Sequence, residues 1–321
     1  MGKKENVRQH VVPRFYLEGF ADATGQVHAL EVSTGKVFTP DPRNICVEKE
    51  AYSIVDNGVL DKSCDQINND VEGPVSLVLA KIHPDIDLTD LAVASEVFTH
   101  LLAFTGNLIA RSRIPRDERN SQVSSISSFL SAHPEAFDNI DHERYLDALR
   151  NPEKYPGLYE RFPMLAKFRT MLLQCNDQDP GPPKVADTLA LFKKLKTDLY
   201  PVLTPVLTGK VTWAAHDLKA KGALLVSDSI NFITSDDPVI YLHDDVGVKG
   251  KQIPESEYWT DPNRAVFLPL KPRVALYWNA NENYELKPVT AERVAHLNKQ
   301  VMANHVRQVF AADPGDFPVA E

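Results

Sequence analysis

The stretch Phe232-Ile233-Thr234-Ser235-Asp236-Asp237-Pro238-Val239 decides the fold class, because an apolar run breaks into a polar turn and then resumes. β-Branched and aromatic residues bounded by Ser, Asp and Pro are typical of short strands joined by a turn. The same alternation recurs through the last third of the chain. It predicts strands at 211–215, 223–226, 231–234, 239–242, 266–268 and 274–278.

The N-terminal sixty residues add a second region of strands. Residues 27–32 and 36–39 flank Ser33-Thr34-Gly35, which predicts a hairpin, and a further strand is predicted within 46–54. Before the hairpin, residues 9–20 are predicted to form a short helical turn that Pro13 opens, with the aromatic and leucine side chains as anchors in the core.

Helices are predicted between these two regions. Apolar residues recur every three or four positions over 61–83 and 89–112, which indicates two amphipathic helices. A last helix is predicted over 290–311, with Thr290 as its N-cap. Shorter helices are predicted at 117–132, 141–150, 155–175 and 185–199.

This order of elements favours an α+β fold. We expect a mixed or antiparallel sheet from the N-terminal hairpin and the C-terminal strands, with a large central helical block. The chain is expected to be a single large domain, 1–321. The alternative is a split into a sheet-rich part, 1–60 plus 205–321, and a helical insertion, 61–204.

Composition excludes several classes of protein. A formal net charge of −9 over 321 residues argues against a broad DNA-binding surface, where a basic excess is expected. A local basic groove is still compatible with the cluster Arg111, Arg113, Arg116 and Arg119. The oligomeric state is not indicated by any pattern in the sequence.

The three cysteines, Cys46, Cys64 and Cys175, form no Cys-x-x-Cys pair. Neither a zinc knuckle nor a thioredoxin-type redox pair is therefore predicted. The N-terminus lacks the apolar core of a signal peptide, and no stretch approaches about 18 uninterrupted apolar residues. We expect a cytoplasmic protein without a membrane span.

Two polar groups near the N-terminus and on the first long helix are candidates for a site. His10 beside a Pro-fixed turn suits proton transfer near neutral pH, and Arg14 suits a carboxylate or phosphate. Glu72 borders the apolar stripe of the 61–83 helix and requires a cation, for which Arg14, Arg111 or Arg113 are available. Each of these residues also has a structural explanation: backbone satisfaction for His10, a solvated rim position for Glu72 and helix-end complementation for the arginines.

Two further candidates lie in the C-terminal third. Ser235, Asp236 and Asp237 place hydroxyl and carboxylate groups at a strand end, where they could orient a base or hold a hard divalent metal, or form an ordinary turn. On the predicted last helix, Asn298, Met302, His305 and Val309 share one face. Buried Asn and His side chains there would satisfy loop backbone or face a polar cavity.

The chain resembles the mainly bacterial family named domain of unknown function 4238. The resemblance extends from end to end, and the first and fourth of the matching segments are the distinctive ones. The segments are Gln9-His10-Val11-Val12-Pro13-Arg14-Phe15-Tyr16-Leu17, Glu72-Gly73, Arg113-Ile114-Pro115, Phe232 to Val239, Phe267-Leu268-Pro269-Leu270, and Asn298 leading into Val306-Arg307-Gln308-Val309-Phe310. The resemblance implies that the typical polar positions are His10, Arg14, Glu72, Arg113, Asp236 and Asn298, and it implies no particular activity.

Two functions fit this set of residues. The favoured one is a hydrolase acting on a phosphate-containing substrate, a nucleotide or other phosphate-containing small molecule or RNA, because guanidinium groups match phosphate. A nuclease-like role in cellular defence is one version of it. Its catalytic residues would be His10, Glu72 and Asp236, and its substrate-binding residues Arg14, Arg113, Ser235 and Asn298, with a divalent metal at Asp236 and Asp237 as the possible cofactor. The second is a non-enzymatic sensor or protein-interaction module in which the same residues form a structural network. An open pocket around His10, Glu72 and Asp236 would favour the first, and sealed pairs would favour the second.

Overall fold

The computed structural model describes residues 8–49, 51, 54–56, 59–61, 63–112, 147, 150–156, 221–248 and 260–318. The predicted helices at 117–132 and 185–199 and the strand at 211–215 lie outside these residues, as do most of the helices predicted at 141–150 and 155–175. The chain divides into two compact units, Met1–Arg119 with Leu199–Glu321, and Asn120–Asp198. In the second unit the structure describes the short 3-10 helix η2 (Pro152–Lys154).

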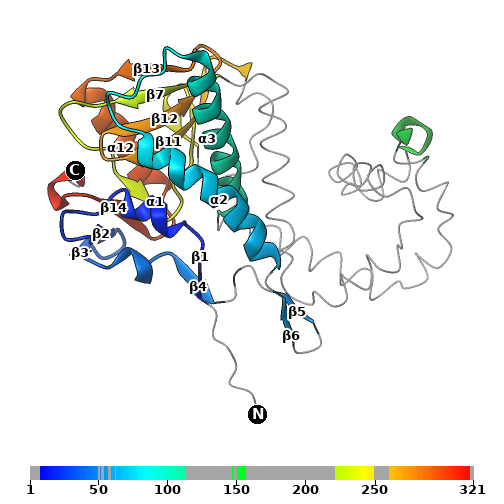
Figure 1. The fold of residues 1–321 in the computed structure, drawn as a ribbon, viewed down its shortest axis with the longest axis horizontal. Coiled ribbons are helices and arrows are strands. Elements are labelled where there is room, and N and C mark those ends of the chain that lie inside the picture. The colour runs from blue at the N-terminus through cyan, green and yellow to red at the C-terminus, as the bar shows by residue number, and fades with distance from the viewer. Residues whose placement is uncertain are drawn as a thin grey trace. The chain divides into compact units, whose positions relative to one another are not determined.

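A six-stranded mixed sheet is the centre of the first unit, and four of its strands confirm those predicted in the C-terminal third (Figure 1). Its order is β10 (Val246–Gly247), β9 (Ile240–His243), β11 (Arg264–Lys271), β12 (Val274–Trp278), β7 (Gly222–Val226) and β13 (Glu285–Pro288). Only β13 is parallel to its neighbour, β7. β13 was not predicted, because its exposed Glu285, Lys287 and Pro288 are edge-strand residues that give no apolar alternation.

The N-terminal hairpin forms as predicted, but it belongs to a different sheet. Its strands are β2 (His28–Glu31) and β3 (Lys36–Phe38). In the sheet the order is β3, β2, β14 (Gln308–Ala311) and β8 (Thr234–Ser235), each antiparallel to its neighbour. The first and last parts of the chain are thus paired in a four-stranded sheet. The α+β class is confirmed, with the strands distributed over separate sheets.

Two smaller ladders complete the strands. β1 (Arg8–His10) pairs antiparallel with β4 (Val47–Lys49), and β5 (Ile54–Asp56) pairs with β6 (Val59–Asp61). The short helix α1 (Arg14–Glu18) follows Pro13 as predicted, whereas residues 9 and 10 belong to β1 and not to the helical turn. Pro42–Asn44 and Pro314–Asp316 form the 3-10 helices η1 and η3.

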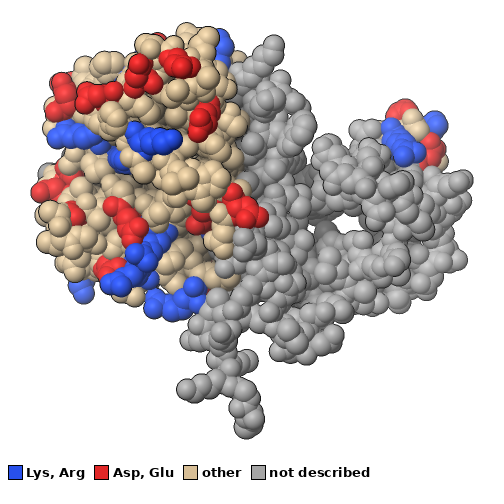
Figure 2. Space-filling view, in the orientation of Figure 1, with Lys and Arg blue, Asp and Glu red and all other residues tan. Residues whose placement is uncertain are grey.

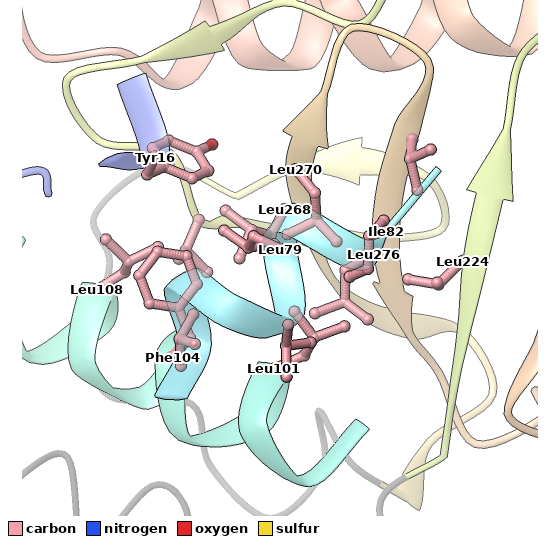
Figure 3. Close-up of a cluster of buried hydrophobic side chains, with 14 of the residues drawn as sticks. Tyr16, Leu79, Ile82, Leu101, Phe104, Leu108, Leu224, Leu268, Leu270 and Leu276 are labelled. Atoms are coloured by element: carbon pink, nitrogen blue, oxygen red, sulfur yellow. The ribbon is translucent and has the colours of Figure 1, made fainter. Parts of the chain in front are cut away.

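The two long helices, α2 (Ser63–Lys81) and α3 (Leu91–Arg111), confirm the amphipathic segments and share one core with the sheet (Figure 3). Ile82, which follows α2, and Leu101 of α3 are fully buried with Leu276 of β12. Close packing also fixes a glycine, because a Cβ at Gly222 would lie 2.6 Å from the ring of Trp278 on β12. Alternate strand residues point to opposite faces, so the other face of the sheet is free for a second layer.

Helix α12 (Ala291–Asn304) forms that layer, with Val294, Leu297 and Val301 buried against the sheet. The predicted N-cap is confirmed, because the Thr290 hydroxyl accepts a hydrogen bond from the helix backbone. The prediction of a helix over 290–311 is wrong beyond Asn304, where the chain turns and forms β14. The predicted common helical face is therefore also wrong for its last two members, since His305 follows the helix and Val309 lies in the strand.

Among the described residues, one helix, α3, is long and apolar enough to cross a membrane. However, 61% of its most apolar 18-residue window is buried inside the fold. A core helix of a soluble protein passes the same test, so α3 is weak evidence for a membrane span.

Candidate functional site

A buried arginine at the end of α3 connects three parts of the fold. The side chain of Arg111 is 3% exposed and its Nη1 donates to Oε1 of Glu72 on α2 at 2.5 Å. Nη1 also donates to Oδ1 of Asn107 at 3.1 Å, and Nη2 donates to the backbone oxygen of His10 at 3.2 Å. Of the two described cations that the sequence offered to Glu72, Arg14 and Arg111, it is Arg111 that binds it.

This group extends by one further residue toward α2. Asn107 Nδ2 donates to Oδ1 of Asn68 at 3.1 Å, and both side chains are buried. We call Arg111, Glu72, Asn107, Asn68 and the backbone of His10 the Arg111 network. It joins β1 to both long helices through buried and part-buried hydrogen bonds, which are worth more than bonds at the surface.

The ring of His10 is half-buried and lies against η1. Its Nε2 is 3.3 Å from the backbone oxygen of Pro42, and since a carbonyl only accepts, Nε2 carries the hydrogen and Nδ1 the lone pair. Burial lowers the pKa of His10 below its ordinary value of 6.5, outweighing the hydrogen bond to Pro42 and the negative charge of Glu72. His10 is therefore predominantly neutral at pH 7.

Arg14, which was predicted to bind a carboxylate or phosphate, lies at the surface of α1. Its side chain is 51% exposed and forms an ion pair at 2.6 Å with Glu18, one helical turn further on. Figure 2 shows acidic and basic side chains interspersed over one face of the described residues. Arg113 lies outside the described residues.

Asp236 is a capping residue for the turn between α12 and β14. Oδ1 accepts a hydrogen bond from the backbone N–H of Val306 at 3.0 Å. Oδ2 accepts from Arg307 at 2.9 Å and from Gln308 at 3.1 Å. Burial raises the pKa of Asp236, because desolvation outweighs these three hydrogen bonds.

Ser235 and Asn298 also bind backbone atoms of the fold. The hydroxyl of buried Ser235 accepts from the N–H of Asp237 at 3.2 Å. Asn298 on α12 accepts from the N–H of Ile233 at 3.1 Å and donates to the oxygen of Asn231 at 2.8 Å. The predicted strand at 231–234 is confirmed only at Thr234, because β8 is Thr234–Ser235 and the N–H of Ile233 binds the Asn298 side chain.

The carboxylates at 236 and 237 provide little support for a metal. Both oxygens of Asp236 already accept hydrogen bonds, and Asp237 is 1% exposed. Within the part of the chain that the structure describes, no group of three or more His, Cys, Asp or Glu side chains could hold a metal ion.

Tyr16 is a buried residue that connects α1 to β8 and β11. The sequence analysis treated it as an apolar anchor and did not name its hydroxyl as a polar group. Its hydroxyl donates to the oxygen of Pro269 at 2.6 Å and lies 2.6 Å from Oγ1 of Thr234. Pro269 lies where the register between β11 and β12 shifts, which leaves its carbonyl available to a side chain. A buried Tyr hydroxyl usually finds a hydrogen-bond partner, so the Tyr in the N-terminal motif was the available signal.

Cys46 lies close enough to Asp236 to be affected by its charge, and it is not an activated nucleophile. Burial raises the pKa of its thiol well above the ordinary value, and the charge of Asp236 adds to this effect. A reactive thiol has a lowered pKa.

The predicted site residues thus fall into two groups. His10 and Glu72 are brought together through Arg111. Ser235, Asp236 and Asn298 bind backbone atoms of residues 231–237 and of the α12–β14 turn.

No curated protein sequence and no solved structure matches this chain. One family model, described as "Protein of unknown function (DUF4238)", matches residues 8–315. Since the match spans nearly the whole sequence, the chain belongs to the DUF4238 family.

Proposed function

We propose that this chain is a non-enzymatic binding module, a sensor or protein-interaction domain, in which the polar residues typical of the family form a structural network. The observation that carries the proposal is that both carboxylate oxygens of Asp236 are already engaged in hydrogen bonds. Its two oxygens accept three backbone hydrogen bonds from the α12–β14 turn, at 2.9 to 3.1 Å. A general base requires an oxygen that can reach the proton it removes.

The second carboxylate gives the same support. Glu72 is bound by Arg111, whose side chain is almost fully buried, and removal of one partner from such a pair leaves an uncompensated charge. Using Glu72 as an acid or base would require opening this pair. A role in holding α2, α3 and β1 together requires no such change.

Hydrolysis of a phosphate-containing substrate, a nucleotide or RNA, is the second candidate function. It is favoured by one observation, the neutral ring of His10 with a lone pair on Nδ1. A neutral imidazole can accept a proton near pH 7. The arginines needed for phosphate are the weaker part of this proposal, because Arg14 is paired with Glu18 and Arg111 with Glu72.

The experiment compares turnover and stability in the same variants. Wild type and His10→Gln would be assayed on an aryl phosphate, an aryl phosphodiester, nucleoside triphosphates and short RNA, each with EDTA, Mg²⁺ or Mn²⁺. The Gln amide can still donate to Pro42, so His10→Gln removes the base with little loss of structure. The binding module predicts no turnover by either protein.

Turnover by wild type that is abolished in His10→Gln, at an unchanged melting temperature, would overturn the proposal in favour of the hydrolase. Asp228→Asn serves as the matched control, because Asp228 is an exposed carboxylate that belongs to neither polar group. Activity that persists in His10→Gln and in the control would indicate a contaminating enzyme. Such activity should separate from the protein when each variant is purified by a second method.

A further inference from the structure

A polar pocket of about 710 Å³ lies on the α12 face of the six-stranded sheet, and it shares no residue with the Arg111 network. Its walls come from the turn between β9 and β10, the end of β12, the loop before β13, and the start of α12. This volume is in the range of small-molecule sites. The residues that matter for its chemistry are Asp245, Tyr277, Asn279, Glu282, Lys287 and Arg293.

One wall of the pocket is fixed by a bidentate ion pair. Arg293 donates to both oxygens of Asp245 at 2.7 and 2.8 Å, and the Tyr277 hydroxyl donates to the same carboxylate at 3.3 Å. The hydrogen bonds from Arg293 hold the pKa of Asp245 below its ordinary value. Arg293 also lies 5.7 Å from the centre of the Tyr277 ring. These three side chains are satisfied by one another, so they shape the pocket and leave its binding capacity to other residues.

The loop before β13 is rigid at its base. Asn279 Nδ2 donates to the backbone oxygens of Pro262 and Arg264, at 2.9 and 2.8 Å, and Oδ1 accepts from the N–H of Asn281 at 2.9 Å. All of these bonds hold backbone. The next acidic side chain, Glu282, is therefore presented from a fixed loop.

Glu282 is the residue of the pocket whose hydrogen bonding is incomplete. It is only 4% exposed, and its Oε1 accepts one hydrogen bond from Nζ of Lys287 at 2.7 Å. Its Oε2 is buried and has no hydrogen-bond partner among the described residues. A buried carboxylate oxygen without a donor is costly. Lys287 supplies a single contact from a side chain that is 50% exposed.

The missing contact defines the chemistry of a ligand. A guanidinium group presents two parallel N–H donors that match the two oxygens of a carboxylate, whereas an ammonium is a point charge. Three carboxylates, Asp244, Asp245 and Glu282, face two cationic side chains in the pocket lining, so the site carries an excess of negative charge. We propose that this pocket binds a small molecule with a guanidinium group, which engages both oxygens of Glu282 and displaces Lys287.

In the unliganded protein Lys287 stands in for this ligand and competes with it. This gives two substitutions with opposite effects. Removing Glu282 removes the acceptor, whereas removing Lys287 removes the competitor and leaves the carboxylate without a cation. The site goes beyond the proposed function, because it stands whether the chain is a binding module or a hydrolase.

The test is calorimetric titration of the full-length protein with agmatine, a small guanidinium compound, and with cadaverine, a diamine of similar length. We expect wild type to bind agmatine at least about tenfold more tightly than cadaverine, because only agmatine can satisfy both oxygens. Glu282→Gln should weaken agmatine binding about tenfold or more. Lys287→Met should strengthen it about two- to fivefold, the amount that a partly exposed ion pair is worth. Agmatine should also raise the melting temperature of Lys287→Met more than that of wild type.

Glu285→Gln is the matched control, since Glu285 lies three residues from Glu282, is exposed and does not line the pocket. Its affinity should equal that of wild type. The proposal is overturned if agmatine binds neither wild type nor Lys287→Met, or if folded Glu282→Gln binds it as tightly as wild type. If Glu282→Gln does not fold, an affinity of Lys287→Met no higher than that of wild type overturns it. None of these outcomes depends on the hydrolysis assay, so the two proposals fail separately.

Discussion

Replacing Asp236 with alanine should destabilise the protein by an amount that its three hydrogen bonds determine. The substitution leaves the backbone N–H groups of Val306, Arg307 and Gln308 without an acceptor that now lies at 2.9 to 3.1 Å. Each unsatisfied buried donor costs about 1–3 kcal/mol, and the lower end applies here because these three hydrogen bonds are only part-buried or exposed. The sum is about 3–5 kcal/mol.

Part of this loss is offset by the carboxylate itself. Burial raises the pKa of Asp236, so its ionised form is disfavoured in the folded state, and its removal recovers some free energy. We therefore expect a net loss of about 3 kcal/mol for Asp236→Ala. Asp236→Asn should lose less, about 1–2 kcal/mol, because it retains one acceptor and buries no charge.

The assay is urea unfolding followed by circular dichroism, together with amide hydrogen exchange in the 304–310 segment. Asp236→Ala should lower the urea midpoint and increase exchange at these amides. The control is Asp228→Ala at an exposed carboxylate, which should change stability by less than about 0.5 kcal/mol. If Asp236→Ala matches that control in stability and in exchange, the capping role is refuted and Asp236 is again a candidate for catalysis.

Three further outcomes follow from the network and the helix cap. Arg111→Met should destabilise by about 3 kcal/mol because it leaves Glu72 with an uncompensated charge, whereas Arg14→Met at an exposed ion pair should cost less than about 1 kcal/mol; urea unfolding of both checks this, and equal effects would contradict it. The lowered pKa of His10 contributes stability that is present above its ordinary value of 6.5 and is lost as the pH falls through the lowered value, so the melting temperature of wild type should fall below pH 6.5 more steeply than that of His10→Gln, and parallel curves would exclude the effect. Thr290→Ala should cost about 1 kcal/mol by removing the N-cap of α12, measured by thermal unfolding, and an unchanged melting temperature would show that the cap is dispensable.

Local patterns predicted the elements whose formation depends on neighbouring residues. The apolar spacing over 61–83 and 89–112 corresponds to α2 and α3, and Ser33-Thr34-Gly35 corresponds to the β2–β3 turn. A helix stripe or a hairpin turn is encoded within a few residues. The sequence also identified Glu72, beside the apolar stripe, as a candidate for pairing with a cation, with a solvated rim position as the alternative, and the structure pairs it with Arg111.

Elements that depend on a distant side chain were predicted incorrectly or incompletely. The helix predicted over 290–311 ends at Asn304, because the carboxylate of Asp236 binds the N–H groups of the next turn and directs the chain into β14. Likewise the side chain of Asn298 binds the N–H of Ile233, and β8 begins only at Thr234, the last residue of the predicted strand. In both cases the partner is more than sixty residues away along the chain, beyond the reach of a local pattern.

By itself, the sequence determined the α+β class, the family and the list of polar residues that need partners, because composition, periodicity and motif are properties of neighbouring residues. Only the tertiary structure decided which partner each residue has. It paired Arg111 with Glu72, Asp236 with the α12–β14 turn, and Asn298 with the backbone of Asn231 and Ile233. The physical reason is that a buried charge or hydrogen-bonding group is stabilised by whatever the fold brings within about 3 Å, and chain topology, not spacing in the sequence, sets that distance.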